Sequence, residues 1–561
     1  MTTPTHITGS KGSDVYSSTG SALLDLSVRL VRGADAADLA TRIQAVASDS
    51  VADAFVLAFH ARNIRGGKGE RDLFKEMYMA LHVALPAQAE ELLDLVPHYG
   101  SWRDVFDLDL HAAPHVAAAQ LRKDAATPAG ESISLCAKWA PRESSASKAK
   151  AAFLAACLFP KETPHSAQMK AYRKLVAGLN RRLDTVETHM CSASWADIKP
   201  QSVPGRAGKV YRRALLNLTS SYKPGQGLTP RQGQELRKPD DADRMACREH
   251  FVAHYTAAAA GVKGVKVHGA DTLMPHEIVK KAASLLNGDS ASEKDALIAV
   301  WRSLVEKVRG QGGLGRSIMM GDFSGSMQSA GAQGDTPYWV SMALSVLGSQ
   351  CCTGAFKDRF MTFDSTPKWH QLTSGNVFDH LQTILASRLG QGTSTDFQAA
   401  MDLVLATLKE QRVRPGEEPE NLIVLTDMNW DAACGSADTS FYSRNSYRHH
   451  VKHEGWETHV EMIRESFKRA GEDMYGSGNG WKMPRIVIWN LAAPADNHLD
   501  FHATADTPGV AMLSGWSAAQ FKVLCEVGPR QLTPLEILRV ELDDPQYDLV
   551  RRRLAAFATD L

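Results

Sequence analysis

The strongest constraint on the fold is a change of pattern after residue 310. From there on, short runs of consecutive apolar residues alternate with segments in which apolar residues recur every three or four positions. The first pattern is typical of buried strands and the second of amphipathic helices. Strands and helices in alternation favour a doubly wound, mostly parallel α/β sheet. The strands that we expect are 316–321, 359–363, 421–426, 485–491 and 509–513.

The first half of the chain has a helical pattern instead. Apolar residues occur at three- and four-residue spacing, and short turns containing Gly or Pro separate the segments, which are 36–48, 51–63, 70–84 and 87–95. Successive short helices of this kind favour a bundle or a solenoid of stacked helical hairpins.

These patterns suggest a division of the chain near the glycine-rich stretch 310–315. Residues 21–309 are expected to form a helical domain and residues 310–561 an α/β domain. Thr, Ser and Gly dominate residues 1–20, which we expect to be a flexible tail. Scattered Pro and Gly in a basic stretch predict an irregular insertion over 200–245.

Composition excludes several classes of protein. No window reaches the roughly 18 consecutive apolar residues of a membrane helix. The N-terminus is polar and lacks the apolar core of a signal peptide. The eight cysteines form no CxxC pair, as a zinc ribbon would require. We therefore expect a cytoplasmic protein with reduced thiols and no membrane partner.

A formal net charge of zero conceals an uneven distribution. Residues 1–310 hold 41 Lys+Arg and 33 Asp+Glu, a net charge of +8, whereas residues 311–561 hold 22 and 30, a net charge of −8. Between 138 and 248 basic residues outnumber acidic ones more than two to one. Such a block is a candidate contact surface for a polyanion, and a solvated helical surface is the equally weighted alternative.

Two of the expected strands lead directly into acidic loops. RSIMMG is followed by Asp322-Phe323-Ser324-Gly325-Ser326, with the spacing D-x-S-x-S, and NLIVLT is followed by Asp427. Ligands of open α/β sheets bind beyond the carboxyl ends of the strands. Carboxylate and hydroxyl oxygens suit Mg²⁺ or Mn²⁺, whereas zinc favours His and Cys. The alternative is that both aspartates merely cap turns or helices.

A third polar segment, Gly390–Asp396, lies between these two in the sequence and precedes a helical pattern. The three segments in this order resemble the metal-ion-dependent adhesion site of von Willebrand factor A domains, which have a Rossmann-like fold. Thr393 competes with Thr395 for the threonine of that site, and the Thr-Asp step favours Thr395. In those domains the metal completes its coordination with a carboxylate of a partner protein. The resemblance implies a metal site formed by Asp322, Ser324, Ser326, Thr395 and Asp427.

A helical array followed by such a domain resembles the layout of Ro/TROVE ribonucleoproteins, and more closely an uncharacterised domain family with this layout in viruses, bacteria and plants. The segments that carry the resemblance are RNIRGGKGER (62–71), HYGSWRD (98–104), KWAPRE (138–143) and GVAMLSG (509–515). Ro proteins bind small structured RNAs on a ring of helical repeats. The resemblance implies that Trp102 and Trp139 stack on bases and that RNA phosphates face Arg62, Arg65, Lys68, Arg71, Lys138 and Arg142.

These segments also have plain structural interpretations. RNIRGGKGER could be a connection between two helices, with its glycines closing the first one. Trp102 and Trp139 could be core residues, which is the commoner use of tryptophan. The histidines of the insertion 436–456 lack cysteine partners at zinc-ligand spacing.

The expected function is that of a non-enzymatic RNA-binding protein whose α/β domain binds Mg²⁺ or Mn²⁺ and docks a protein partner. No Ser-His-Asp or Cys-His set can be assembled from the sequence, so we expect no catalytic residues. One alternative is a protein–protein scaffold that uses the metal site without nucleic acid. A weaker alternative is a metal-dependent hydrolase that uses Asp322 and Asp427.

Overall fold

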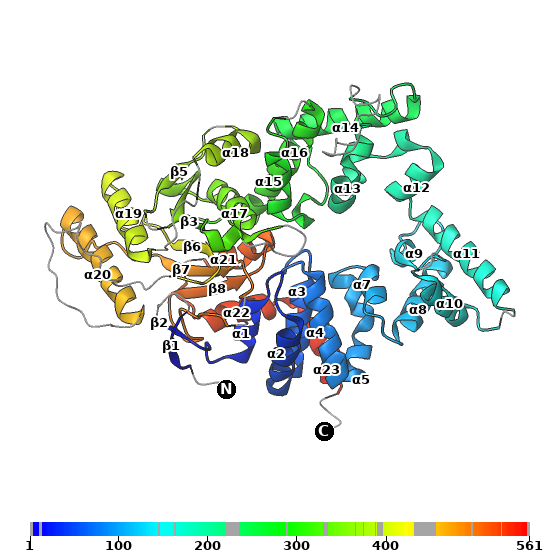
Figure 1. Cartoon of the computed structure of the whole chain (residues 1–561), viewed down its shortest axis with the longest axis horizontal. Coiled ribbons are helices and arrows are strands. Elements are labelled where there is room, and N and C mark those ends of the chain that lie inside the picture. Colours follow the sequence, from blue (N-terminus) through cyan, green and yellow to red (C-terminus); the bar gives the residue numbers. More distant parts are fainter. Residues whose placement is uncertain are drawn as a thin grey trace. The chain divides into compact units, whose positions relative to one another are not determined.

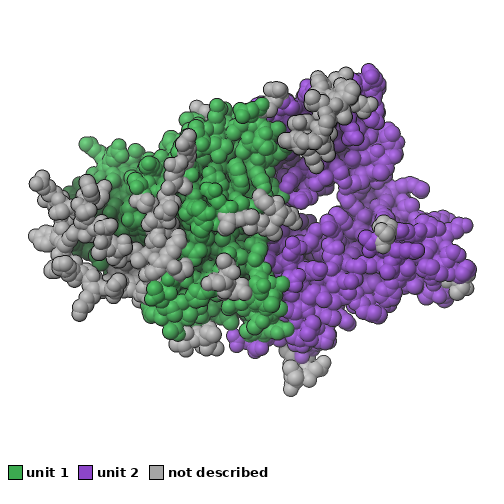
Figure 2. All heavy atoms as spheres, in the orientation of Figure 1, with its two compact units in different colours: residues 1–46, 274–287, 304–545 green, residues 47–273, 288–303, 546–561 purple. Residues whose placement is uncertain are grey.

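The computed structural model describes residues 4–9, 14–143, 146–161, 164–219, 235–287, 290–328, 335–364, 366–373, 375–387, 389, 396–430, 456–494, 498–528 and 530–557 (Figure 1). The chain forms two compact units (Figure 2). Unit 1 consists of residues 1–46, 274–287 and 304–545, and unit 2 of residues 47–273, 288–303 and 546–561. Each unit thus combines stretches that are far apart in the sequence, whereas the sequence suggested one division near residue 310.

Unit 1 is a mixed α/β structure around a six-stranded sheet with the order β5-β4-β3-β6-β7-β8. Neighbouring strands are parallel except for the edge strand β5, which is antiparallel to β4. Every residue of β3, β6, β7 and β8 is buried, as their continuous apolar runs require. The strands are β3 (Ser317–Asp322), β4 (Arg359–Phe363), β5 (Trp369–Gln371), β6 (Asn421–Thr426), β7 (Arg485–Asn490) and β8 (Val510–Ser514).

Helices of unit 1 pack against this sheet. The helix α17 contacts β3, β4 and β6, α19 contacts β4, and both α1 and α22 contact β8. Two helices, α2 and α16, extend across a boundary between the units. The helices are α1 (Ala22–Arg29), α2 (Ala36–Asp49), α15 (Pro275–Ala283), α16 (Ala291–Gly310), α17 (Pro337–Cys351), α18 (Val377–Ala386), α19 (Phe397–Glu410), α20 (Trp456–Tyr475), α21 (Phe521–Val527) and α22 (Pro534–Leu542).

The N-terminal residues expected to be a flexible tail are built into unit 1 where they are described. The strands β1 (His6–Thr8) and β2 (Asp14–Tyr16) form an antiparallel pair, and the N–H of Tyr16 donates to the carbonyl oxygen of Phe501 at 2.8 Å. The hydroxyl of Ser18 donates to the Asp25 carboxylate at 2.6 Å. Val15 and Thr19 are each 1% exposed. The polar content misled because the hydroxyls of Ser18 and Thr19 both bond to the Asp25 carboxylate of α1.

Unit 2 is helical, and its N-terminal part is organised around a cluster of aromatic rings in tilted and edge-to-face contact. Phe59 packs against Phe74, Tyr78 and Tyr99 with ring centroids 4.9–5.9 Å apart. The helices are α3 (Val51–Arg62), α4 (Arg71–Ala84), α5 (Pro86–Glu91), α6 (Val96–Tyr99), α7 (Trp102–Asp107), α8 (Ala113–Ala126), α9 (Cys136–Trp139), α10 (Lys148–Leu158), α11 (His165–Arg182), α12 (Val186–Ser192), α13 (Gly205–Leu215), α14 (Ala242–Ala260) and α23 (Asp548–Ala555).

The basic stretch 200–245 is not irregular throughout. Residues 205–215 form α13, with Leu215 fully buried, and α14 starts at Ala242, where the Asp241 carboxylate accepts from the N–H of Arg244. Residues 220–234 and 431–455, the latter covering nearly all of the expected histidine-containing insertion, lie outside the described residues. Each cysteine in the described part of the chain is a free thiol. Within the described ranges, no helix combines the length and apolarity needed to cross a bilayer.

Candidate functional site

Asp322 and Asp427 lie at the carboxyl ends of two neighbouring parallel strands. Asp322 is the last residue of β3, and Asp427 directly follows β6. Gly321 pairs with Leu425 across these strands, so Asp322 is level with Thr426, one residue before Asp427. Asp322 is fully buried and Asp427 is 4% exposed. The sheet therefore brings two buried carboxylates to one edge, as the sequence predicted.

The D-x-S-x-S segment forms a tight turn at the end of β3. The N–H of Ser324 donates to Asp322 Oδ1 at 2.8 Å, and the hydroxyl oxygens of Ser324 and Ser326 are 3.0 Å apart. A 3-10 helix over Gly325–Gln328 continues the turn. One carboxylate and two hydroxyls are thereby held within a single turn of backbone.

Thr426 connects the two loops. Its hydroxyl donates to Asp322 Oδ2 at 3.4 Å and accepts from the N–H of Met428 at 3.1 Å and from the indole N–H of Trp430 at 3.0 Å. Met428 has a φ of 69°, in the left-handed region, which turns the chain sharply after Asp427. Thr426 is fully buried. Its hydroxyl bonds to the Asp322 carboxylate and to the backbone of the loop that contains Asp427, and it thereby links the two aspartates.

If Asp322 and Asp427 hold a divalent cation, Thr426→Val should weaken its binding by about tenfold, because the isosteric methyl group removes the hydroxyl that orients these loops, as loss of a supporting hydrogen bond does at metal sites. Thr426→Ser, which keeps the hydroxyl, is the matched control and should bind nearly as the wild type does. Calorimetric titration with Mn²⁺ measures both. Equal affinity in Thr426→Val would show that Thr426 has no positioning role.

An aromatic stack supports the loop after β6. The Trp430 ring lies between Phe397, at 5.6 Å and 10° between the ring planes, and His502, at 4.1 Å and 17°. Nε2 of His502 bonds to the carbonyl oxygen of Met428 at 2.9 Å. Burial lowers the pKa of His502 to about 4, so the imidazole is neutral at pH 7 and donates this bond from Nε2. The loop that carries Asp427 is thus held on both sides.

Sequence reasoning missed Thr426, Trp430 and His502. Thr426 and Trp430 lie within three residues of Asp427, so their proximity was a usable signal. His502 is 75 residues further along, and only the fold brings it to this loop.

The donor set fits a hard cation. The oxygens at the carboxyl ends of β3 and β6 are those of two carboxylates and of the hydroxyls of a D-x-S-x-S turn, which are the ligand types that Mg²⁺ or Mn²⁺ prefers. Asp396, after the threonine segment, is the N-cap of α19 and accepts from the N–H of Ala399 at 2.9 Å. Thr395 and Thr393 lie outside the described residues. Among the residues that are described, no three His, Cys, Asp or Glu side chains gather at one point.

Two of the six residues expected to face RNA are buried in unit 2. Arg62 is 4% exposed and Lys68 is 1% exposed. Nε and Nη2 of Arg62 each lie 2.8 Å from Oδ2 of Asp104, which is itself 2% exposed. Burial lowers the pKa of Arg62, an effect that Asp104 opposes. Arg62 and Lys68 therefore do not belong to an RNA-facing surface, because positive charge in a sequence does not reveal burial.

The other four residues are at least partly accessible. Arg71 is paired with Asp104, with its Nε 2.6 Å from Oδ1, and Lys138 bonds to a carboxylate of α12 at 3.0 Å. Arg65 and Arg142 are exposed. Of the two tryptophans, Trp102 is a core residue at 7% exposure, whereas Trp139 is 37% exposed.

RNIRGGKGER connects α3 to α4. The N–H groups of Lys68 and Glu70 donate to the carbonyl oxygens of His60 and Ala61, at 3.1 and 2.8 Å. A Cβ at Gly67 would lie 2.1 Å from the carbonyl oxygen of His60, so this close approach requires glycine. The segment is therefore a connection between two helices, as its structural interpretation predicts, but the residue that caps the end of α3 is Asn63 and not a glycine.

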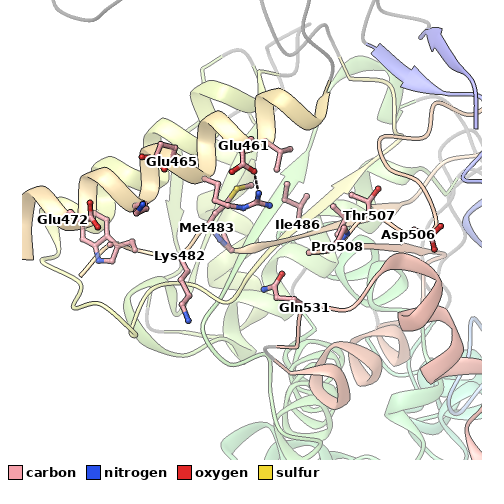
Figure 3. A pocket seen from close by; sticks show the side chains of 18 of the residues that line it. Glu461, Glu465, Glu472, Lys482, Met483, Ile486, Asp506, Thr507, Pro508 and Gln531 are labelled. Atoms are coloured by element: carbon pink, nitrogen blue, oxygen red, sulfur yellow. Dashed lines mark hydrogen bonds and ion pairs between the residues drawn. The ribbon is translucent and has the colours of Figure 1, made fainter. Parts of the chain in front are cut away.

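A cavity of about 1060 Å³ lies elsewhere in unit 1 (Figure 3). The helix α20 and the residues before β7 and β8 form its walls, so it is at the amino edge of the sheet, opposite the two aspartates. Its labelled side chains include the acidic Glu461, Glu465 and Asp506 as well as Lys482 and Gln531 (Figure 3). This mixture of charges specifies no ligand class.

Comparison with known proteins adds two findings. A family described as "Domain of unknown function (DUF7788)" matches residues 316–544, which include β3, β6 and both aspartates. The chain is also 25% identical over 554 residues to "Uncharacterized protein L728" of Acanthamoeba polyphaga mimivirus, covering 94% of this chain and 85% of the viral protein. The similarity thus extends over both units, and neither description names a function.

Proposed function

We propose that this chain is a divalent-cation-dependent docking protein. The cation, Mg²⁺ or Mn²⁺, is held at the carboxyl edge of the sheet by Asp322, Ser324, Ser326 and Asp427, with Thr395 as a further ligand. A carboxylate of a protein partner completes the coordination. The observation that carries this proposal is the hydrogen-bonded turn that fixes Asp322 and both serine hydroxyls at the end of β3, next to the strand that the buried Asp427 follows.

The resemblance to the metal-ion-dependent adhesion site supports docking over hydrolysis. The order of the sheet supports it too, since the site lies where the connections from β3 and β6 diverge to opposite sides. The imidazole beside this site, His502, is fully buried by Trp430 and bonded to Met428, which disfavours it as a general base.

Mn²⁺ titration of the full chain, followed by water-proton relaxation, tests this function. We expect saturable binding, and we expect added acetate to lower the relaxation enhancement because its carboxylate displaces water from the bound ion. Absence of Mn²⁺ binding would refute the proposal. Binding that acetate leaves unchanged would refute the docking mode.

RNA binding by unit 2 is a second candidate function, favoured by one observation. The exposed ring of Trp139 has two cations near its face, with Arg103 Cζ at 6.0 Å and Lys138 Nζ at 5.9 Å from its centroid. An aromatic ring flanked by cations suits a stacked base with its phosphate.

We expect Trp139→Ala combined with Arg142→Glu to weaken binding of a structured RNA with a single-stranded end by about tenfold or more, the loss of one stacked base. Lys75→Glu, at an exposed position of α4, is the control for unspecific charge effects. Fluorescence anisotropy at two salt concentrations measures the affinity and its salt slope. Equal losses in both variants would indicate unspecific attraction, and no binding by the wild type would exclude this function.

A further inference from the structure

The last residues of the chain fold back onto the connection between α3 and α4 within unit 2. We call residues 546–557 the C-terminal segment. The Asn63 side-chain amide donates to Gln546 Oε1 at 2.6 Å, and the Tyr99 hydroxyl donates to the Gln546 carbonyl oxygen at 2.7 Å. The hydroxyl of Tyr547 bonds to Nδ1 of His60 and to the Asn63 amide, both at 3.1 Å. These four hydrogen bonds thus contact two adjacent residues of the C-terminal segment, Gln546 and Tyr547.

Tyr547 is the anchor of this contact. It is fully buried, and its ring stacks on that of Tyr99 at 5.5 Å and 23° between the planes. A buried tyrosine with both its ring and its hydroxyl satisfied is typical of a specific recognition pocket.

Two arginines extend the contact along α23. Arg551 Nη1 lies 3.0 Å from Asp53, and Arg553 binds both oxygens of Asp94 at 2.5 and 3.0 Å. Arg553 also lines an acidic cavity of about 390 Å³ with Glu90, Glu91 and Asp94. The surface is therefore complementary in charge to the basic end of the segment.

The connection RNIRGGKGER fits closely against the C-terminal segment. Asn63 Oδ1 accepts from the N–H groups of Arg65 and Gly66, which leaves the amide nitrogen directed at the C-terminal segment. A Cβ at Gly66 would lie 3.0 Å from Gln546 Oε1, so a larger residue would crowd the segment. The motif thereby acquires a role other than RNA contact.

The segment itself is too short to be a stable helix alone. The helix α23 has eight residues, and isolated helices shorter than about 12 residues are marginal in water. Its order therefore depends on docking. Because it is covalently attached, its effective concentration at this surface is on the order of millimolar, so a modest intrinsic affinity keeps it bound.

We propose that His60, Asn63, Tyr99, Asp53 and Asp94 form a peptide-recognition site whose ligand is the chain's own C-terminal segment. The bound segment can dissociate from this site while the rest of unit 2 stays folded. The site recognises a Gln-Tyr pair followed by arginines four and six residues after the tyrosine. It is independent of the proposed cation site.

A labelled peptide of residues 544–557, titrated into full-length chains, tests this proposal. The full-length variant Tyr547→Ala with Arg553→Ala vacates the site and should bind the peptide, whereas the wild type, with its site occupied, should bind at least about 50-fold more weakly. A peptide carrying Tyr547→Ala is the control and should bind neither chain. Equal binding to both chains, or binding to neither, would overturn the proposal.

A second variant tests the same proposal in case the first variant does not fold. Full-length Asp94→Arg should bind a peptide carrying Arg553→Asp more tightly than the wild-type peptide, because the ion pair is restored with reversed polarity. Hydrogen exchange on the wild type gives an independent measure: amides of α23 should exchange at least about 100-fold faster than those of α4, since release needs no unfolding of unit 2. Equal exchange rates would show a permanent core element instead.

Discussion

Replacing Asp322 with asparagine is expected to abolish Mg²⁺ and Mn²⁺ binding and to leave the fold intact. The amide keeps an oxygen that accepts from the N–H of Ser324, so the turn is preserved, and it loses only the long bond of 3.4 Å from the Thr426 hydroxyl, which an amide nitrogen cannot accept. It removes the negative charge that a hard cation requires. Affinity should fall by at least about 100-fold, the upper range for changes around a metal site.

Thermal unfolding with and without 5 mM Mg²⁺, together with calorimetric titration, measures this effect. A ligand that binds the folded state alone stabilises it by RT ln(1 + [L]/Kd), so the wild type should gain stability with Mg²⁺ and the variant should not. Asp473→Ala, at an exposed position of α20, is the control and should respond as the wild type does. An unchanged response in Asp322→Asn would mean that Asp322 only caps its turn.

Replacing Asp104 with alanine is expected to destabilise unit 2 by about 3–5 kcal/mol, the typical effect of removing one partner of a buried ion pair. Asp104 is 2% exposed and bonds to both Arg62 and Arg71. It also caps α7, where it accepts from the N–H of Ser101 at 2.8 Å. Alanine would leave the buried guanidinium of Arg62 uncompensated.

Two further variants separate charge from other effects in urea unfolding. Asp107→Ala removes an exposed pair with Arg103 on the same helix and should have an effect below about 1 kcal/mol. Adding Arg62→Met to Asp104→Ala removes the stranded charge and should recover part of the loss. If Asp104→Ala unfolds at the same urea concentration as Asp107→Ala, the buried pair contributes nothing to stability.

The central strands were predictable because their signal is local. The expected spans 359–363 and 421–426 coincide with β4 and β6, since continuous apolar runs bounded by polar residues leave little freedom in register. The edge strand β5 was missed: its sequence Trp-His-Gln has no apolar run, and it pairs only with β4. Edge strands are half exposed and so lack the pattern of buried ones.

The common position of Asp322 and Asp427 was predictable for the same reason, whereas the burial of Arg62 and Lys68 was not. Asp322 ends β3 and Asp427 directly follows β6, so their common position follows from the parallel sheet. The burial of Arg62 depends on Asp104, 42 residues away, and on packing around it. The sequence around Arg62 does not reveal that its partner is Asp104, because the two residues are far apart in the chain.

The contact of α1 with β8 has a consequence for biosynthesis. The Asn490 amide donates to the carbonyl oxygen of Val28 at 2.9 Å, and the Ser514 hydroxyl donates to that of Ser27 at 2.5 Å. These partners are 462 and 487 residues apart. During translation the apolar face of α1 thus emerges from the ribosome long before the strand that covers it is made. Docking of α1 onto the sheet therefore waits until β7 and β8 have been synthesised, and the long sequence separation makes this contact a slow step in the folding of unit 1.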